Sequence, residues 1–364
     1  MKKLWLEFRP VIGLLLVWRL ILGGVELWAP KWLTLRPGFL GPVPWANLDG
    51  VHYLSIAQHG YSQFEQAFFP LYPWLIRWGS QLTGISPVTI GLAISYLGLL
   101  IGLGYFFRLA KTLVPRGALW SVIFLLAFPT SFFFASVYTE GLFLGLAVAT
   151  VYFATRKQWL LSGILGALAG LTRLAGIFLG IVVLAEFLKT KPLKRKLTAK
   201  LSLGLVPLGL VFYLGYLWRT VGDPLAFFHA QPAFGAGRSG EEFILLPQVL
   251  WRYAKIFLTV PFWSLSYQVA ILELGSFLAG LSLLWVGWRQ KIPSSYLVYS
   301  GCLLIIPTLT GTLSSLPRYF LAAFPLFFVL GNLHNRLTKT IITLIFIGAL
   351  IILTSWFLQG YFVA

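Results

Sequence analysis

Cysteine and acidic residues are scarce in this chain. Cys302 is its one cysteine, and only 10 of the 364 residues are Asp or Glu. A single cysteine allows no disulfide bond within the chain and excludes metal sites built from several cysteines. Charged residues of both signs make up 10% of the chain, whereas about a quarter of the residues of an ordinary soluble protein are charged. The composition therefore disfavours a soluble protein.

Long apolar runs take the place of the missing charge. Hydrophobic residues make up 58% of the chain and its mean hydropathy is +0.84. The runs predict an all-α polytopic membrane protein with about 11 transmembrane helices, since a span needs about 20 apolar residues. The start, MKKLWLEFRPVIGLLLVWRLILGG, resembles a signal peptide but has no clear cleavage site, so we expect a retained first span. The runs lie near 11–29, 85–107, 118–135, 139–155, 158–172, 174–188, 201–218, 266–288, 296–313, 319–333 and 340–358.

The net charge of +18 is typical of nucleic-acid-binding proteins, but the positions of the charges indicate membrane topology instead. With the N-terminus in the cytoplasm and alternating spans, most of the 28 Lys and Arg residues fall in inside loops. This is the bias that the positive-inside rule describes. The densest cluster, KTKPLKRKLTAK at 189–200, lies in one of these loops. We therefore expect a lipid bilayer and no nucleic acid as partner, and the short loops favour a prokaryotic plasma membrane.

Two segments, 30–84 and 220–264, are too long to be simple turns, and the same topology places both outside. Most of the acidic residues lie in or beside these segments, whereas the inside loops carry almost none. A purely structural membrane protein would not need this asymmetry. The sequence therefore places chemistry or binding on the extracytoplasmic face.

The stretch WANLDGVHYLSIAQHGY, residues 45–61, is the most polar part of the first external segment. Its spacing predicts a short surface helix that begins near Asp49 and ends at Gly60, because glycine commonly ends helices. We expect Pro70 and Pro73 to break any helix that follows and to turn the chain toward the next span. On spacing alone, Asp49 is either the cap of this helix or a reactive carboxylate.

Six ordered motifs between about residue 45 and residue 331 resemble the PIG-V-like mannosyltransferases, prokaryotic relatives of the second mannosyltransferase of glycosylphosphatidylinositol assembly. Any one of them alone would be a weak signal, and it is their order that carries the resemblance. The motifs are LDGVHYLSIAQHGY, AFFPLYPWLIR, FPTSFFFASVYTEGLFL, GILGALAGLTRLAGIFL, GDPLAFFHAQ and SLPRYFLAAFPLF.

The resemblance implies a GT-C glycosyltransferase, a single transmembrane domain over residues 1–364 with short interfacial helices in the first external loop. Such enzymes use a polyprenyl-phosphate sugar on the outer face of the membrane, and an acid in the first external loop, here Asp49, is the catalytic base. One base suffices if cations meet the leaving phosphate, which then needs no general acid. Many family members have Trp where this chain has Leu48, which leaves the carboxylate in place but puts a sugar or lipid contact in question.

Arginines at the outer ends of spans are the expected partners of the donor phosphate, because Arg makes bidentate contacts with phosphate. The candidates are Arg77, Arg173 and Arg318, with snorkelling toward the interface as the alternative role. Glu140 either orients sugar hydroxyls, pairs with an arginine or merely favours the dipole at the start of its helix.

His52 and His229 are further candidate contacts to substrate, one in each external segment. The spacing of His52 and His59 matches no standard set of metal ligands, so we expect no metal or other cofactor. The acceptor is unknown: a hydroxyl of a lipid, a glycan or a protein fits equally well.

A sugar or lipid transporter (a flippase) is the main rival of another class. It would favour internal repeats and ionisable residues in the middle of spans, whereas the chain shows no clear duplication and its acids gather outside. A non-catalytic membrane subunit would not need Asp49 beside so many external arginines. Among enzymes, an arabinosyl or oligosaccharyl transferase of the same architecture is the nearest alternative.

Overall fold

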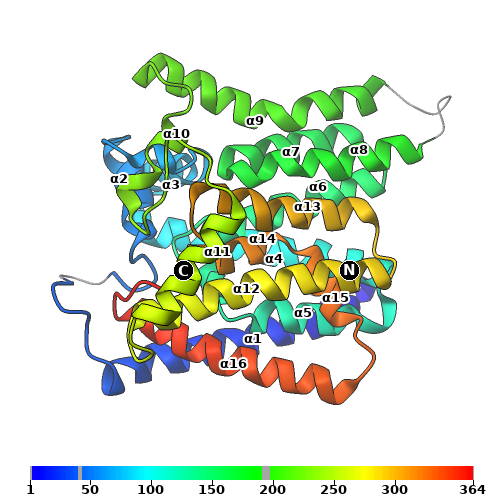
Figure 1. The fold of residues 1–364 in the computed structure, drawn as a ribbon. Coiled ribbons are helices and arrows are strands. Elements are labelled where there is room, and N and C mark those ends of the chain that lie inside the picture. Colours follow the sequence, from blue (N-terminus) through cyan, green and yellow to red (C-terminus); the bar gives the residue numbers. More distant parts are fainter. Residues whose placement is uncertain (1, 40–42, 191–196, 364) are drawn as a thin grey trace.

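The computed structural model describes residues 2–39, 43–190 and 197–363, and every regular element in these ranges is a helix (Figure 1). The longest are α1 (Lys2–Trp32), α4 (Pro87–Leu113), α9 (Leu197–Val221), α12 (Leu265–Arg289) and α16 (Arg336–Leu358). The shorter α-helices are α2 (Asp49–His59), α3 (Leu71–Thr83), α5 (Ala118–Ala127), α6 (Glu140–Thr155), α7 (Trp159–Thr172), α8 (Leu179–Lys189), α10 (Ala226–His229), α11 (Leu246–Thr259), α13 (Ser294–Ile305), α14 (Leu316–Ala322) and α15 (Pro325–Gly331). Short 3₁₀ helices include η1 (Glu65–Ala67), η3 (Ser131–Ala135), η4 (Leu174–Phe178), η6 (Gln231–Phe234) and η7 (Ile306–Thr310).

Within the described ranges, five helices are long and apolar enough to cross a membrane by length and composition: α1 from Phe8, α4, α9, α12 and α16. Several other predicted runs form shorter helices or two helices in succession, as in α14 followed by α15. An all-α polytopic membrane protein is therefore confirmed. The number of eleven spans stays a prediction.

Small residues let α6 and α7 lie close to their neighbours. A Cβ atom added at Gly141 of α6 would lie 2.3 Å from the carbonyl oxygen of Ser95 in α4, and one at Gly209 of α9 would lie 1.9 Å from that of Ala167 in α7. Helices in membranes commonly approach through small residues in this way. These contacts fix the start of α6, which is Glu140, and the end of α7, which Arg173 follows.

The two predicted external segments share one end of the helical bundle. In Figure 1, α2, α3 and α10 gather at the left, whereas the end of α8 and the start of α9 lie at the right. The basic loop 189–200 joins α8 to α9, and its residues 191–196 lie outside the described ranges. The two polar segments thus lie at one end of the bundle, and the described residues on either side of the basic loop lie at the other. The predicted topology, in which successive spans end on alternate sides of the membrane, requires this arrangement.

The first external segment contains two short helices. As predicted, α2 begins at Asp49 and ends before Gly60, whose φ is 88°. The prediction for the two prolines is wrong, because Pro70 directly precedes α3 and Pro73 lies in its first turn. Amide hydrogens in a first turn have no partner within the helix, so proline is tolerated there.

Large apolar side chains are exposed on α3 and α11 at this end of the bundle. Trp78 and Leu82 of α3 and Trp251 and Leu258 of α11 are all more than half exposed. Helices that lie on a bilayer carry apolar faces of this kind. The arrangement fits interfacial helices in both external segments.

Candidate functional site

A cavity of about 560 Å³ lies where the two external segments meet α7, α13 and α14. The Asp, His and Arg residues among its lining are Asp49, His52, Arg173, Arg238 and Arg318. The remaining wall is mainly apolar and aromatic, with Phe68, Phe69, Phe178, Phe227, Phe228, Phe234, Phe243 and Phe362 among its residues. A mostly apolar pocket with a few convergent polar groups is typical of a ligand site.

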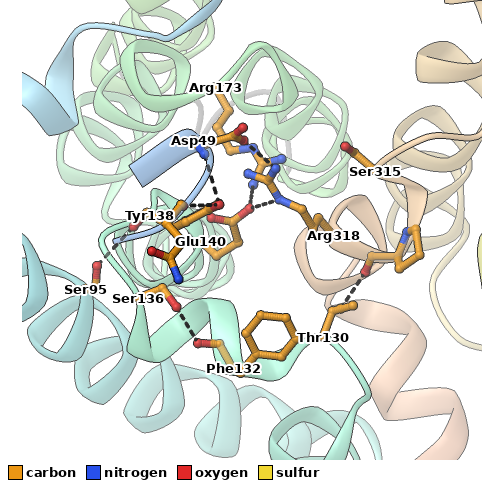
Figure 2. Close-up of polar contacts among 12 residues, drawn as sticks. Asp49, Ser95, Thr130, Phe132, Ser136, Tyr138, Glu140, Arg173, Ser315 and Arg318 are labelled. Atoms are coloured by element: carbon orange, nitrogen blue, oxygen red, sulfur yellow. Dashed lines mark hydrogen bonds and ion pairs between the residues drawn. The ribbon is translucent and has the colours of Figure 1, made fainter. Parts of the chain in front are cut away.

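Four charged side chains form a continuous chain at the polar side of this cavity (Figure 2). Arg318 Nη1 lies 2.5 Å from Asp49 Oδ2, and Arg318 Nε lies 2.9 Å from Glu140 Oε1. Arg173 Nη1 reaches the same Glu140 oxygen at 2.8 Å. Glu140 therefore joins the two arginines, and Arg318 joins the two carboxylates.

Burial separates the roles of the two carboxylates. The side chain of Glu140 is 1% exposed and does not line the cavity, whereas that of Asp49 is 29% exposed and does. Of the three roles considered for Glu140, the structure shows pairing with arginine. Asp49 is the carboxylate that a ligand in the cavity can reach.

The turn that carries Asp49 is held by three hydrogen bonds, two with Tyr138 and one with α16. The Asp49 amide donates to Tyr138 Oη at 3.2 Å, and the Tyr138 hydroxyl donates to the Asn47 carbonyl at 2.9 Å. The Asn47 side-chain amide donates to the carbonyl of Phe357 in α16 at 3.0 Å. Leu48 has a φ of 56°, a conformation that costs a residue other than glycine free energy and is commonly found at functional sites. The backbone before Asp49 is thus fixed although it is strained.

The capping alternative for Asp49 is wrong. Leu48 occupies the cap position of α2, and no side chain caps this helix end. The Asp49 carboxylate instead contacts Arg318, whose guanidinium lies 4.9 Å from the ring centres of both Phe133 and Tyr138. Cation–π contacts of this kind hold the guanidinium in place.

The pKa of the Asp49 carboxyl is the result of opposing effects. Burial raises this pKa. The charge of Arg318 and the hydrogen bond from Arg318 lower it, with smaller effects of Arg238 and His52, and together they outweigh burial. The net pKa lies below the ordinary value for Asp. Asp49 is therefore ionised at neutral pH, and its basicity depends on how tightly Arg318 holds it.

The structure brings most of the predicted site residues together but leaves two outside. His52 lines the cavity; its Nδ1 lies 3.3 Å from Glu65 Oε1 and its ring stacks on Phe68. Arg77 is exposed on α3 and does not line the cavity. His229 pairs with Asp223 at 2.7 Å and borders a separate cavity.

Two residues of the site were missed in the sequence. Tyr138 stands inside the quoted motif FPTSFFFASVYTEGLFL, so its position beside Glu140 was a usable signal. Arg238 lies outside all six motifs, and nothing in its local pattern distinguishes it from other external arginines. Among the described residues, no group of three His, Cys, Asp or Glu side chains is close enough to hold a metal ion.

The architecture is that of a polytopic membrane protein with the GT-C fold. The chain resembles the crystal structure of ArnT from Cupriavidus metallidurans in the apo state, with a TM-score of 0.51 and 19% sequence identity. The likeness covers 88% of this chain and 59% of the ArnT chain. At this identity it shows the fold alone. No family model and no curated protein matches the chain, and the PIG-V-like resemblance stays a prediction.

Proposed function

We propose that the protein is an inverting membrane glycosyltransferase that moves a hexose from a polyprenyl-phosphate sugar to an acceptor hydroxyl, with Asp49 as general base. One observation carries the proposal: a reachable carboxylate pairs with Arg318 at the polar side of a largely apolar cavity whose wall also holds Arg173. A base, cations for a leaving phosphate and an apolar wall for a lipid are what this reaction requires.

The reaction requires one proton acceptor and one place for negative charge. The acceptor oxygen attacks the anomeric carbon from the side opposite the phosphate, and Asp49 takes the hydroxyl proton as this bond forms. The bond from the anomeric carbon to the phosphate oxygen breaks, and its electron pair leaves with the lipid phosphate. Arg173 and Arg318 stabilise that charge as it develops. Because phosphate and Asp49 compete for Arg318, donor binding loosens the hold on Asp49 and makes it a stronger base.

The apolar wall supports a lipid-linked donor. Phe178, Cys302, Leu303 and Ile306 line the cavity on the side of η4 and α13, which suits the isoprenoid chain. The six motifs favour mannose as the sugar, and the positive-inside bias favours the extracytoplasmic face of the plasma membrane. No metal is required, because the arginines supply the positive charge.

A donor screen tests the proposal. Purified protein in lipid nanodiscs is incubated with polyprenyl-phosphate mannose, glucose and arabinose and an acceptor lipid extract, and released polyprenyl phosphate is measured. We expect release with a hexose, mannose first, and none with Asp49→Asn. Release of polyprenyl phosphate from the arabinose donor alone would show that the transferred sugar is a pentose and not a hexose. No release above the Asp49→Asn background with any donor would contradict a transferase of this class.

A further inference from the structure

The charges of Arg173 and Arg318 are already balanced within the protein. Arg173 pairs with Glu140, and Arg318 pairs with both Glu140 and Asp49, so two guanidinium groups face two carboxylates. Two other buried carboxylates do not line the cavity: Glu65 contacts His52 and the amide of Ser62, and Glu273 accepts a hydrogen bond from the Tyr253 hydroxyl. An anionic ligand that met only these arginines would bring a negative charge with nothing left to balance it.

Arg238 is a third arginine in the wall of the same cavity. Its Nη2 donates to the hydroxyls of Ser314 at 3.3 Å and Ser315 at 3.0 Å. Within the described ranges it forms no ion pair with a carboxylate. Its direct contacts are thus with neutral hydroxyls, and Asp49 and Glu273 act on its charge only from beyond ion-pair distance, so the guanidinium is available to a ligand.

The segment that carries Arg238 is anchored to the bundle. The amide of Ser239 donates to the carbonyl of Thr310 at 2.8 Å, and that of Ile244 donates to the carbonyl of Leu309 at 2.9 Å. Ser314 and Ser315, which hold the guanidinium, directly precede α14 and its Arg318. Arg238 thus approaches the cavity from the second external segment, and a guanidinium held by two hydroxyls keeps further N–H donors for a ligand.

We propose that Arg238 binds the phosphate of a polyprenyl-phosphate ligand and supplies the positive charge that balances it. The inference rests on the proposed function and names the residue that determines affinity for the lipid phosphate. A phosphodiester donor carries one negative charge, and Arg238 is one positive charge without a carboxylate partner. Arg173 and Arg318 can then contact the phosphate while their charges still balance that of Glu140. Ser314 and Ser315 offer hydroxyl donors beside the phosphate. Arginine suits this contact because its planar fork matches the phosphate oxygens.

Binding of two lipids that differ only in charge tests the proposal. Polyprenyl phosphate and the uncharged polyprenol of the same length are titrated against the purified protein in nanodiscs. We expect Arg238→Gln to weaken phosphate binding by about tenfold to a hundredfold, the usual effect of losing a hydrogen bond to a charged group. Polyprenol binding and the melting curve should not change. Arg77→Gln, the same charge change at the same end of the bundle but outside the cavity, should behave like wild type.

Each other outcome has a definite meaning. Wild-type affinity of Arg238→Gln for polyprenyl phosphate would overturn the role of Arg238 and leave the proposed function standing. Equal loss of phosphate and polyprenol binding would also overturn it, since Arg238 would then only shape the cavity. If the wild-type protein binds phosphate no better than polyprenol, a lipid-phosphate donor is excluded, and the proposed function fails together with this inference.

Discussion

Asp49 and Arg318 are 269 positions apart in the sequence, yet their side chains form the shortest contact of the charged chain in the cavity. The pair explains how a carboxylate that is largely removed from water stays ionised. It also makes Asp49 a weak base until a ligand draws Arg318 away. In the proposed mechanism, Asp49 becomes active as a base only beside the anionic donor, which would limit hydrolysis of the donor by water.

Replacing Asp49 by Asn tests the role of the carboxylate as a base. The side chain keeps its size and can still accept a hydrogen bond from Arg318, so the protein should still fold, although loss of the ion pair should lower its stability. Transfer should fall by about a hundredfold or more, within the usual range for general base catalysis. Rates and melting curves of the same preparations decide the matter. Near wild-type transfer would remove Asp49 from the mechanism.

The lowered pKa of Asp49 predicts a pH dependence. Because the folded pKa lies below the unfolded value of about 4, the stability from this ion pair is fully present above pH 4. It is lost as the pH falls through the folded pKa. For the same reason the acid limb of kcat/KM, which reports the free enzyme, should lie below about pH 4. A limb near pH 6 would assign the critical ionisation to a group other than Asp49.

Glu140 and Arg318 should depend on each other for stability. Arg318→Gln leaves Asp49 unpaired, and Glu140→Gln leaves two arginines close together, so each should cost about 3 kcal/mol or more of unfolding free energy. The double variant should cost less than the sum, because it removes one charge of each sign and leaves Asp49 and Arg173 in balance. Unfolding curves in detergent measure the three values. Additive losses would show that the pair is not coupled.

At the scale of elements, the approach of α4 to α6 decides where Glu140 lies. Ser95 contributes its carbonyl to the close contact with Gly141, and its hydroxyl donates to the carbonyl of Tyr138 at 3.0 Å. One residue of α4 thus positions both the start of α6 and the tyrosine beside Asp49. The site is built on helix packing and not on a flexible loop.

Gly141→Ala should therefore disturb the site through the backbone. The added Cβ would lie 2.3 Å from a carbonyl oxygen that cannot rotate away, and overpacking of this kind costs about 1–3 kcal/mol. Both the melting temperature and transfer should fall. The matched control is Gly204→Ala in α9, where an added Cβ meets no atom within 4 Å; it should leave both unchanged or raise stability slightly. Equal behaviour of the two variants would refute the packing argument.

At the scale of the whole molecule, the two ends of the bundle differ in chemistry. The end with α2, α3 and α10 carries the cavity, and the opposite end carries the flanks of the basic loop (Figure 1). Anionic lipid and the positive-inside rule both favour the basic end in the cytoplasm. The cavity would then open toward the extracytoplasmic leaflet.

Thiol labelling in intact cells tests this orientation. In a Cys302→Ala background, a cysteine at Glu242 should react with a membrane-impermeant maleimide, and one at Lys200 should react only after the cells are opened. Both positions are exposed, so a lack of reaction reflects the side of the membrane and not burial. Labelling of Lys200→Cys in intact cells, with Glu242→Cys protected, would reverse the topology and the face on which the site lies.

Much of this protein was predictable from local patterns. Apolar runs determine a polytopic helical protein, because removing backbone amides from water forces helix formation wherever the chain enters the bilayer. Gly60 predicted the end of α2, because the preference of glycine for a positive φ at the end of a helix depends only on the local backbone. Pro70 and Pro73 were misjudged because their effect depends on where the helix starts, which local composition does not specify.

The sequence by itself determined the class and the two polar segments, and it identified Asp49 as a candidate catalytic residue. Only the tertiary structure decided where the arginines lie: Arg318 pairs with Asp49, Arg318 and Arg173 converge on Glu140, Arg77 lies outside on α3, and Arg238 enters from the second segment. The physical reason is that an arginine's partner depends on helix packing between distant parts of the chain. Contacts such as that of Gly141 with Ser95 set this packing, and they leave no periodic signal around the arginines themselves.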